Sequence, residues 1–411
     1  MRHSPPKRHS DTAIRVALSC FFFVFGLSSA AWVVRIPDIR NLLSVSTSTL
    51  GILFLCSAIG AMLALLAAPK IIARLSTRFA ITFGFTFIVS GASIAITALI
   101  LQNPVLLGTG NFLSGIGFGI ADVGVNVEGA ELEKRVGRSL LPQLHGAFSV
   151  GTLVGALLGT LSISTGVSVV VQTLILTAVF IVVLILCLPI VPRGTGVRSP
   201  LPQALTKSQA RTNSQLRTPR KTWLHPRILL LGLAIFGGSV AEGGANDWLA
   251  LSLVDDYHIP ASSAALTFAI LVGAMSVVRL TGGRLADRLG RVATLRMFAV
   301  IGICGVCLII LGAPHPPLAW VGAAAWGAGV ALVFPLTISA AADGEDSSGR
   351  VAVVTAFGYS AFLVAPPFLG LIAQQWGLLH MFWIFVALLV LLIIGSGATR
   401  PLPQSSSTPV D

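Results

Sequence analysis

The chain has 411 residues, of which 55% are hydrophobic and only 10% are charged, and its formal net charge is +12. Soluble domains usually hold about 25% charged residues, so a chain of this length with so few is not an ordinary water-soluble protein. The composition excludes a typical soluble enzyme and predicts an all-α membrane protein.

Apolar stretches long enough to cross a bilayer follow one another in two groups of six. A transmembrane helix needs about 20 mostly apolar residues. The first group of expected spans is 13–34, 48–68, 79–100, 104–128, 139–161 and 167–191. The second group is 227–251, 262–283, 292–312, 317–342, 349–373 and 378–398. We therefore expect twelve transmembrane helices in two six-helix bundles, which occupy 1–191 and 227–411.

The segment 192–226 between the two groups is rich in Pro, Ser, Thr and basic residues, which predicts a flexible linker. All Lys and Arg residues except Arg35, Arg40 and Arg279 lie on the side that holds this linker and both termini. This asymmetry follows the positive-inside rule and predicts cytoplasmic termini. It also argues against nucleic acid as the partner of the basic charge. The linker is expected to act as a tether or to touch anionic lipid headgroups.

The apolar run that begins at residue 13 is too long for a signal-peptide core and is expected to remain as the first span. All five cysteines lie inside apolar spans. Cys304 and Cys307 have the spacing of a metal or redox motif, but no His or acidic residue stands near them in the sequence. A packing role is expected for them, and the sequence predicts no metal site and no cofactor.

Acidic residues inside a span are the first candidates for function, because a charged group at a helix centre costs about 2.5–3.5 kcal/mol on insertion scales. In the fourth span Asp122 and Asn126 stand four residues apart and share one helical face. His145 in the fifth span lies at a similar depth, so a contact with Asp122 or Asn126 is a hypothesis. These residues form either a transport site or a polar cluster that locks two helices together.

In the seventh span Glu242 and Asn246 share a face, and Glu242 falls near the bilayer centre. An unpaired carboxylate there could take up and release a proton during transport, whereas a paired one would be structural. Four glycines at 237, 238, 243 and 244 favour a broken helix that exposes a binding element. The neighbouring Trp248 has the position of an interfacial aromatic residue.

Three further residues complete the candidates from the sequence. Trp32 in the first span is a possible solute contact, since indole rings stack on sugar rings. Arg35 caps the outer end of that span in either a structural or a functional role. Arg279 either extends toward the cytoplasm or pairs with a carboxylate across the interface between the two halves.

Residues 283–291 read G-x-x-x-D-R-x-G-R between the eighth and ninth expected spans. This pattern resembles the cytoplasmic loop signature of the major facilitator superfamily, in which it follows the second helix of a six-helix half. The resemblance implies a conformational latch, formed here by Gly283, Asp287, Arg288, Gly290 and Arg291. A degenerate copy occupies 69–78, where the first Gly, the Asp and the second Gly are replaced. The partner latch in the first half is therefore expected to be weak or absent.

Three blocks resemble the bacterial inner-membrane permeases of the YbjJ type, which are related to the fucose permease branch of that superfamily. They begin at Asp122, His145 and Glu242. In this superfamily the first, fourth, seventh and tenth spans line the central cavity, which implies that Asp122, Asn126, Glu242 and Asn246 lie on cavity helices. Drug antiporters usually carry Gly-Pro in the fifth span, and Ala156 after Gly155 departs from that pattern.

The sequence thus predicts a secondary active transporter that moves a small solute by alternating access. Coupling to protons and a sugar-like solute are favoured. The alternatives are proton-driven efflux of amphiphilic compounds or drugs, and a non-transporting receptor on a transporter scaffold. No enzyme is expected, because no nucleophile–base or metal-ligand constellation is present. The expected partners are solute, protons and the lipid bilayer, and the expected state is a monomer in the bacterial inner membrane.

Overall fold

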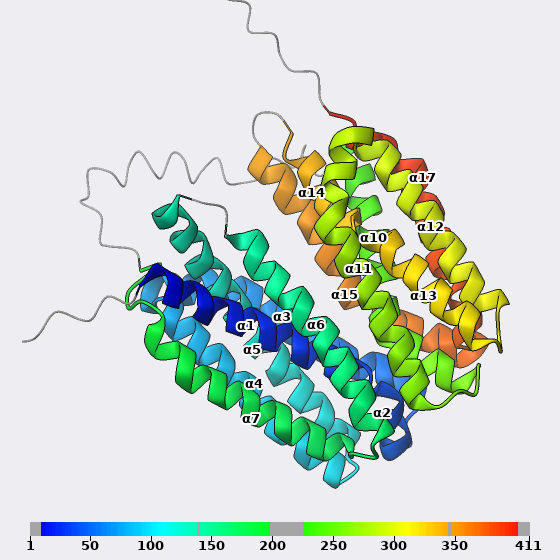
Figure 1. The fold of residues 1–411 in the computed structure, drawn as a ribbon, viewed down its shortest axis with the longest axis horizontal. Helices are drawn as coiled ribbons and strands as arrows, with labels where there is room; N and C mark the ends of the chain where they lie inside the picture. The colour runs from blue at the N-terminus through cyan, green and yellow to red at the C-terminus, as the bar shows by residue number, and fades with distance from the viewer. Residues whose placement is uncertain (1–9, 138–139, 198–224, 344–346, 402–411) are drawn as a thin grey trace, which may run out of the picture. The chain divides into compact units, whose positions relative to one another are not determined.

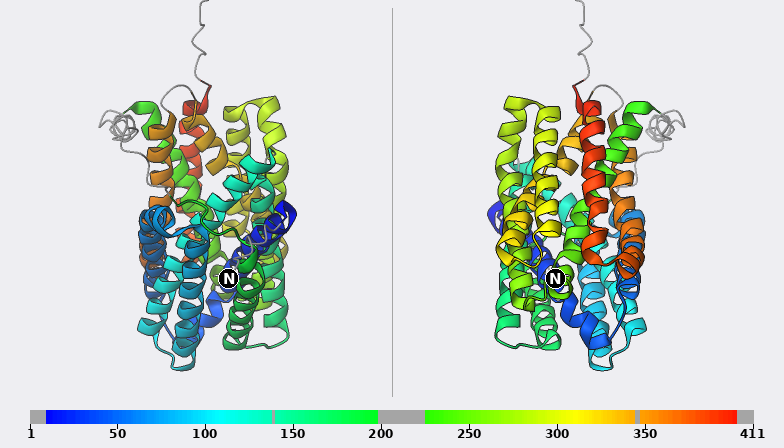
Figure 2. Two further views of the ribbon diagram at one scale, coloured as in Figure 1. Left: turned by 90° about the vertical axis from the view of Figure 1, so that its left-hand side faces the viewer. Right: turned by 90° about the vertical axis from the view of Figure 1, so that its right-hand side faces the viewer.

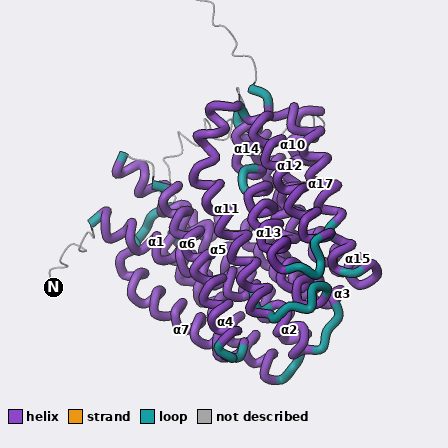
Figure 3. The backbone as a smooth tube through the Cα atoms, turned by 45° about the vertical axis from the view of Figure 1, so that its right-hand side comes forward, coloured by secondary structure: helices purple, strands orange, loops and turns teal. Residues whose placement is uncertain are grey.

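The computed structural model describes residues 10–137, 140–197, 225–343 and 347–401 (Figure 1). These residues are helical almost throughout, and no strand occurs among them (Figure 3). Twelve helices in this part of the chain are long and apolar enough to cross a membrane. The all-α membrane fold expected from the sequence is therefore confirmed. Most of the expected linker at 192–226 lies outside the described residues.

Each expected span corresponds to one helix or to two or three consecutive helical elements. The first six are α1 (Asp11–Val33), α3 (Thr47–Leu75), α4 (Thr77–Ile100), α5 (Pro104–Val136), α6 (Leu141–Ser164) and α7 (Val169–Cys187). A short helix α2 (Ile36–Leu43) joins α1 to α3, and a 3-10 turn η1 (Leu188–Ile190) follows α7. The next helices are α10 (Pro226–Asp255), α11 (Ala261–Leu289), α12 (Arg291–Leu311), α13 (Pro316–Val330), α14 (Val333–Ala341) and α15 (Ser347–Trp376). The last span consists of α16 (Leu378–Met381), α17 (Trp383–Gly395) and η2 (Ser396–Thr399).

Contacts divide the chain into two compact units. The first contains residues 1–200 together with 247–269 and 366–375, and the second contains 201–246, 270–365 and 376–411. Each unit therefore includes parts of α10, α11 and α15. The division into bundles at 1–191 and 227–411 stays a prediction.

The first unit is held by close helix packing and a buried aromatic cluster. In α6 a Cβ atom on Gly151 or Gly155 would lie 2.1 Å from a backbone carbonyl oxygen of α1, so only glycine allows these helices to approach so closely. Figure 1 shows α1 running beside α6. Gly151 and Gly155 thus form a small-residue face in the fifth span. Phe25 of α1 packs against Phe85 of α4 and Phe118 of α5, with ring centroids 5.5 and 5.3 Å apart.

In the second unit α12 packs against α13 and α17 (Figure 2). A Cβ atom on Gly305 of α12 would lie 2.5 Å from the carbonyl oxygen of Gly322 in α13. Trp326 of α13 meets Phe382 and Phe385 with ring centroids 5.3 and 5.2 Å apart. Glycine contacts and a buried aromatic group therefore hold this unit as well.

Two spans, the seventh and the tenth, bear directly on the candidate site. The broken seventh helix expected from the sequence is wrong, because α10 is continuous from Pro226 to Asp255. Its glycines serve packing instead: a Cβ on Gly244 would lie 2.2 Å from the ring of Phe385. The tenth span is interrupted between α13 and α14, just before Pro335. Proline has no N–H for the carbonyl four residues earlier, so the carbonyl of Ala331 lacks its helical donor.

Candidate functional site

Asp122 and Asn126 form a polar pair on α5 within the first unit. The Asn126 side-chain amide donates to Asp122 Oδ1 at 3.0 Å and to the Asp122 carbonyl oxygen at 2.9 Å. The side chain of Asp122 is exposed and forms no ion pair with any described residue. The shared helical face expected from the sequence is confirmed, and the carboxylate keeps one oxygen available to a proton or a solute.

His145 does not join this pair. Its ring lies against Phe22 of α1, with centroids 4.9 Å apart, and the side chain is exposed. No hydrogen bond links His145 to Asp122 or Asn126 in the described part of the chain, so the polar contact expected from their similar depth is wrong. The nearby aromatic ring of α1 takes the place of the expected polar partner.

Glu242 lies near the middle of α10 and is ion-paired, which is one of the two alternatives that the sequence leaves open. Arg279 of α11 donates from Nη2 to Glu242 Oε1 at 2.7 Å. Nε of the same guanidinium donates to the carbonyl oxygen of Ala331 at 3.3 Å. This is the carbonyl that Pro335 leaves without a helical donor. Arg279 therefore joins α10, α11 and the interruption in the tenth span.

This arrangement also corrects the expected role of Arg279. All three groups belong to the second unit, so the arginine pairs inside its own half of the sequence and not across the two halves. The pair is partly accessible, with 35% of the Arg279 side chain and 20% of the Glu242 side chain exposed. Asn246, one turn beyond Glu242 on α10, is half-buried. It forms no side-chain hydrogen bond with the described residues.

Trp248 is buried, and its expected position as an interfacial aromatic residue is wrong. It has 0% exposure and packs edge-on against Phe54 of α3, with ring centroids 5.6 Å apart. Its indole N–H has no partner among the described residues. The preceding Asp247 is half-buried, as is Trp32 on α1.

Two residues of the expected latch, Gly290 and Arg291, have a defined structural role, whereas Asp287 and Arg288 form no ion pair with the described residues. Gly290 has φ +80° and caps α12, a conformation that favours glycine at the junction between α11 and α12. Arg291 of α12 pairs with Asp343 at 2.7 Å, and Arg227 of α10 reaches the same oxygen at 3.2 Å. Asp287 and Arg288 are exposed and form no ion pair with any described side chain. Their role as a latch stays a prediction.

Glu128 borders the fourth span and is not among the site residues that the sequence predicts, although it is fully buried in the first unit. Its carboxylate has 0% exposure and accepts hydrogen bonds from Thr77 at 2.5 Å and Thr195 at 3.3 Å. Thr77 in the degenerate copy corresponds to Arg291 in the intact motif. The two halves thus form corresponding contacts. In the first half a neutral threonine donates to the carboxylate of Glu128, and in the second half Arg291 forms an ion pair with Asp343. The sequence signal that could identify this contact is the alignment of residues 69–78 with the motif at 283–291.

Two arginines between the first and second spans stabilise the first unit. Arg35 is 3% exposed and donates to Gln172 at 2.9 Å, Asp38 at 2.6 Å, Ser162 at 2.7 Å and the Val167 carbonyl at 2.5 Å. These contacts use four of the five N–H donors of the guanidinium, which favours the structural role for Arg35.

Arg40 of α2 forms a bidentate ion pair with Asp255 at the end of α10, with Nη2 and Oδ1 2.9 Å apart. In the same unit Thr47 of α3 donates to the Gly370 carbonyl of α15 at 3.2 Å. These contacts join the start of the second span to the ends of the seventh and eleventh. Sequence reasoning did not identify this connection.

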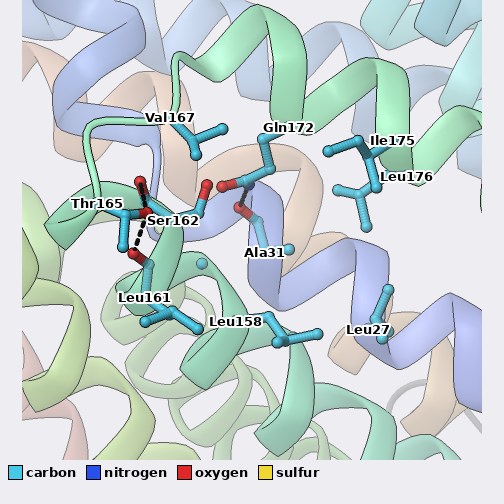
Figure 4. A pocket seen from close by; sticks show the side chains of 12 residues that line it. Leu27, Ala31, Leu158, Leu161, Ser162, Thr165, Val167, Gln172, Ile175 and Leu176 are labelled. Atoms are coloured by element: carbon cyan, nitrogen blue, oxygen red, sulfur yellow. Dashed lines mark hydrogen bonds between the residues drawn. The ribbon is translucent and has the colours of Figure 1, made fainter.

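A pocket of about 280 Å³ lies between α1, α6 and α7 (Figure 4). Its lining is largely apolar, with Ser162, Thr165 and Gln172 as polar members. Gln172 donates to the Ala31 carbonyl at 2.7 Å, and Ser162 and Gln172 are already bonded to Arg35. None of the candidate site residues lines this pocket, so it is distinct from the polar clusters of α5 and α10.

Comparison with known proteins agrees with these features. The chain is 28% identical to an uncharacterised MFS-type transporter of Yersinia pestis over 93% of its own length and 94% of the relative. Its fold matches the nucleoside transporter NupG with a TM-score of 0.75 at 15% identity, over 94% of this chain and 99% of NupG. It matches the E. coli fucose:proton symporter FucP with a TM-score of 0.62 at 16% identity, over 94% of this chain and 98% of FucP. The Major Facilitator Superfamily profile matches residues 17–351. The chain therefore belongs to the major facilitator superfamily of transporters, and it is not an enzyme.

Proposed function

We propose that this transporter is a proton-coupled symporter of a polar, sugar-like solute. The observation that carries the proposal is the partly exposed Glu242–Arg279 pair in the middle of two apolar spans. Charged groups inside a membrane helix are costly, and they are retained where they face a solute or proton path. The exposed Asp122–Asn126 pair on α5 offers a second group of the same kind.

The neutral polar groups fit a hydroxylated solute. Asn126 and Asn246 supply amide donors and acceptors, and Trp32 supplies an aromatic face, which are the groups that sugar sites use. NupG is a nucleoside transporter and FucP a fucose:proton symporter, and their shared fold makes a ribose-like or hexose-like solute a reasonable first choice. The three blocks around Asp122, His145 and Glu242 support a place in the YbjJ-type group.

The proposal includes the position of the protein in the cell. We place it in the bacterial inner membrane as a monomer with both termini in the cytoplasm, which agrees with the distribution of basic residues. Asp287, Arg288 and the rest of the 283–291 motif would then lie on the cytoplasmic side and act in conformational exchange.

The test is uptake by proteoliposomes that contain the full chain, with the external solution more acidic than the lumen. Labelled pentoses, hexoses, nucleosides and sugar acids are compared with and without an uncoupler. Accumulation that the uncoupler abolishes supports symport. Accumulation that rises with the uncoupler in intact cells identifies efflux, and a folded protein that moves no solute of these classes contradicts the proposal.

A further inference from the structure

We propose that Arg279 binds a carboxylate of the transported solute and that this carboxylate competes with Glu242. The inference rests on the proposed function and narrows its solute to a polyhydroxylated carboxylate, the sugar-acid class. It starts from the geometry of the arginine, whose Nε and Nη2 are bonded to Ala331 and Glu242.

The guanidinium is held in place but is not saturated. Its Nη1 donates to no described residue, although the carboxylate and the carbonyl fix the rest of the group. Pro335 makes this anchor possible, because it removes the helical donor of Ala331. An arginine presents a planar fork that matches the two oxygens of a carboxylate. Arg279 thus has a fixed orientation and an unfilled edge.

The pair is accessible although it lies in apolar spans. The exposed fractions of 35% for Arg279 and 20% for Glu242 leave both charged ends open to a ligand. The other helices packed against this turn of α10 present apolar groups: Val333 of α14 contacts Gly238, and Phe362 of α15 contacts Gly243. Arg279 is the charged group that contacts Glu242 from the described elements, and Asp247 is the next acid along α10.

Competition for Arg279 couples the proton to the solute. When Glu242 is ionised it occupies Nη2, and a second carboxylate meets like-charge repulsion. When Glu242 binds a proton it no longer neutralises Arg279, and the solute carboxylate takes its place in the fork. Return of the proton to solution restores the Glu242–Arg279 pair and expels the solute. One proton and one monoanion therefore move together, and the transport step carries no net charge.

The probe is D-gluconate, with D-glucose as the uncharged control of similar size. In proteoliposomes with a fixed pH gradient, gluconate uptake should not change when a potassium gradient and valinomycin impose a membrane potential. Glucose should bind about tenfold more weakly or not at all, since it lacks the charge-assisted contact. Electrogenic, proton-driven uptake of neutral sugars overturns this inference and leaves the proposed function intact. Failure to move any solute would defeat both.

Variants separate the binding of the solute carboxylate by Arg279 from the exchange of a proton by Glu242. Arg279→Gln and Arg279→Lys should both lose about tenfold or more in gluconate affinity, because the lysine keeps the charge without the fork. Glu242→Gln should retain gluconate binding and exchange but lose the pH dependence of binding. Arg296→Gln is the matched control, since Arg296 on α12 bonds to Ser396 away from this pair. Size-exclusion profiles confirm that each variant is folded, and unchanged gluconate affinity in folded Arg279→Gln contradicts the proposal.

Discussion

Thr77 donates a hydrogen bond of 2.5 Å to the fully buried carboxylate of Glu128. Arg291 and Asp343 form the corresponding contact in the second half, at 2.7 Å. In each half the contact ties the first turn of one helix to the cytoplasmic end expected for the fourth helix of that half. The two motif copies therefore share a structural contact, although the copy at 69–78 is degenerate.

We expect Glu128→Ala to destabilise the protein by about 1–3 kcal/mol, because it leaves the buried Thr77 and the half-buried Thr195 without their acceptor. Glu128→Gln keeps an acceptor and should cost less. Glu131→Ala on the same helix is the control, since its side chain is 53% exposed and its ion pair in the described part of the chain is with Lys134. Thermal unfolding of the purified protein measures all three. Equal losses for Glu128→Ala and Glu131→Ala would show that the buried contact is unimportant.

We expect the Arg40–Asp255 ion pair to increase the thermal stability of the protein. Arg40→Asp and Asp255→Arg are each expected to lower thermal stability, because each places like charges opposite one another. The double variant restores an opposite pair and should recover most of the loss, with a coupling energy of about 1 kcal/mol. A double-mutant cycle by thermal unfolding checks this, and additive losses would exclude a direct interaction.

Asp122 should act through its free carboxylate and not through helix packing. Asp122→Asn keeps the hydrogen-bonding shape beside Asn126, so we expect unchanged stability and a transport rate reduced by about tenfold or more, as for loss of a proton-transfer group. Asn126→Ala removes only the partner amide and should reduce transport less. Initial uptake rates at equal protein in the membrane provide the measurement. Full transport by Asp122→Asn would make the pair structural.

The sequence was sufficient for the all-α membrane fold, which follows from the lengths of its apolar stretches. It was also sufficient for the helical faces of the candidate residues, which follow from the helical period. Asp122 with Asn126 and Glu242 with Asn246 could be identified in this way. Their partners could not, since Arg279 is 37 residues from Glu242 and no local spacing records that contact. Pro335 did carry a usable signal, because a proline always frees the carbonyl four residues earlier.

The other errors have the same physical origin. The place of Trp248 near a helix end predicts a position at the membrane interface, but the side chain is buried and packs against Phe54 from another helix. The glycines in α10 predict a weak helix when each is considered alone, whereas neighbouring side chains such as Phe385 occupy the space that a Cβ would fill. Arg40 and Asp255 are 215 residues apart in the chain, and only tertiary structure brings them together. Tertiary packing, not local preference, determined each of these outcomes.

The central claim is that Glu242 exchanges a proton as the solute moves. Its most direct test is proton entry into proteoliposomes, recorded by a trapped pH-sensitive dye when gluconate is added outside without an imposed gradient. The wild-type protein should acidify the lumen, and Glu242→Gln should not, although it still exchanges labelled for unlabelled gluconate. Lumenal acidification by Glu242→Gln at the wild-type rate would contradict the account.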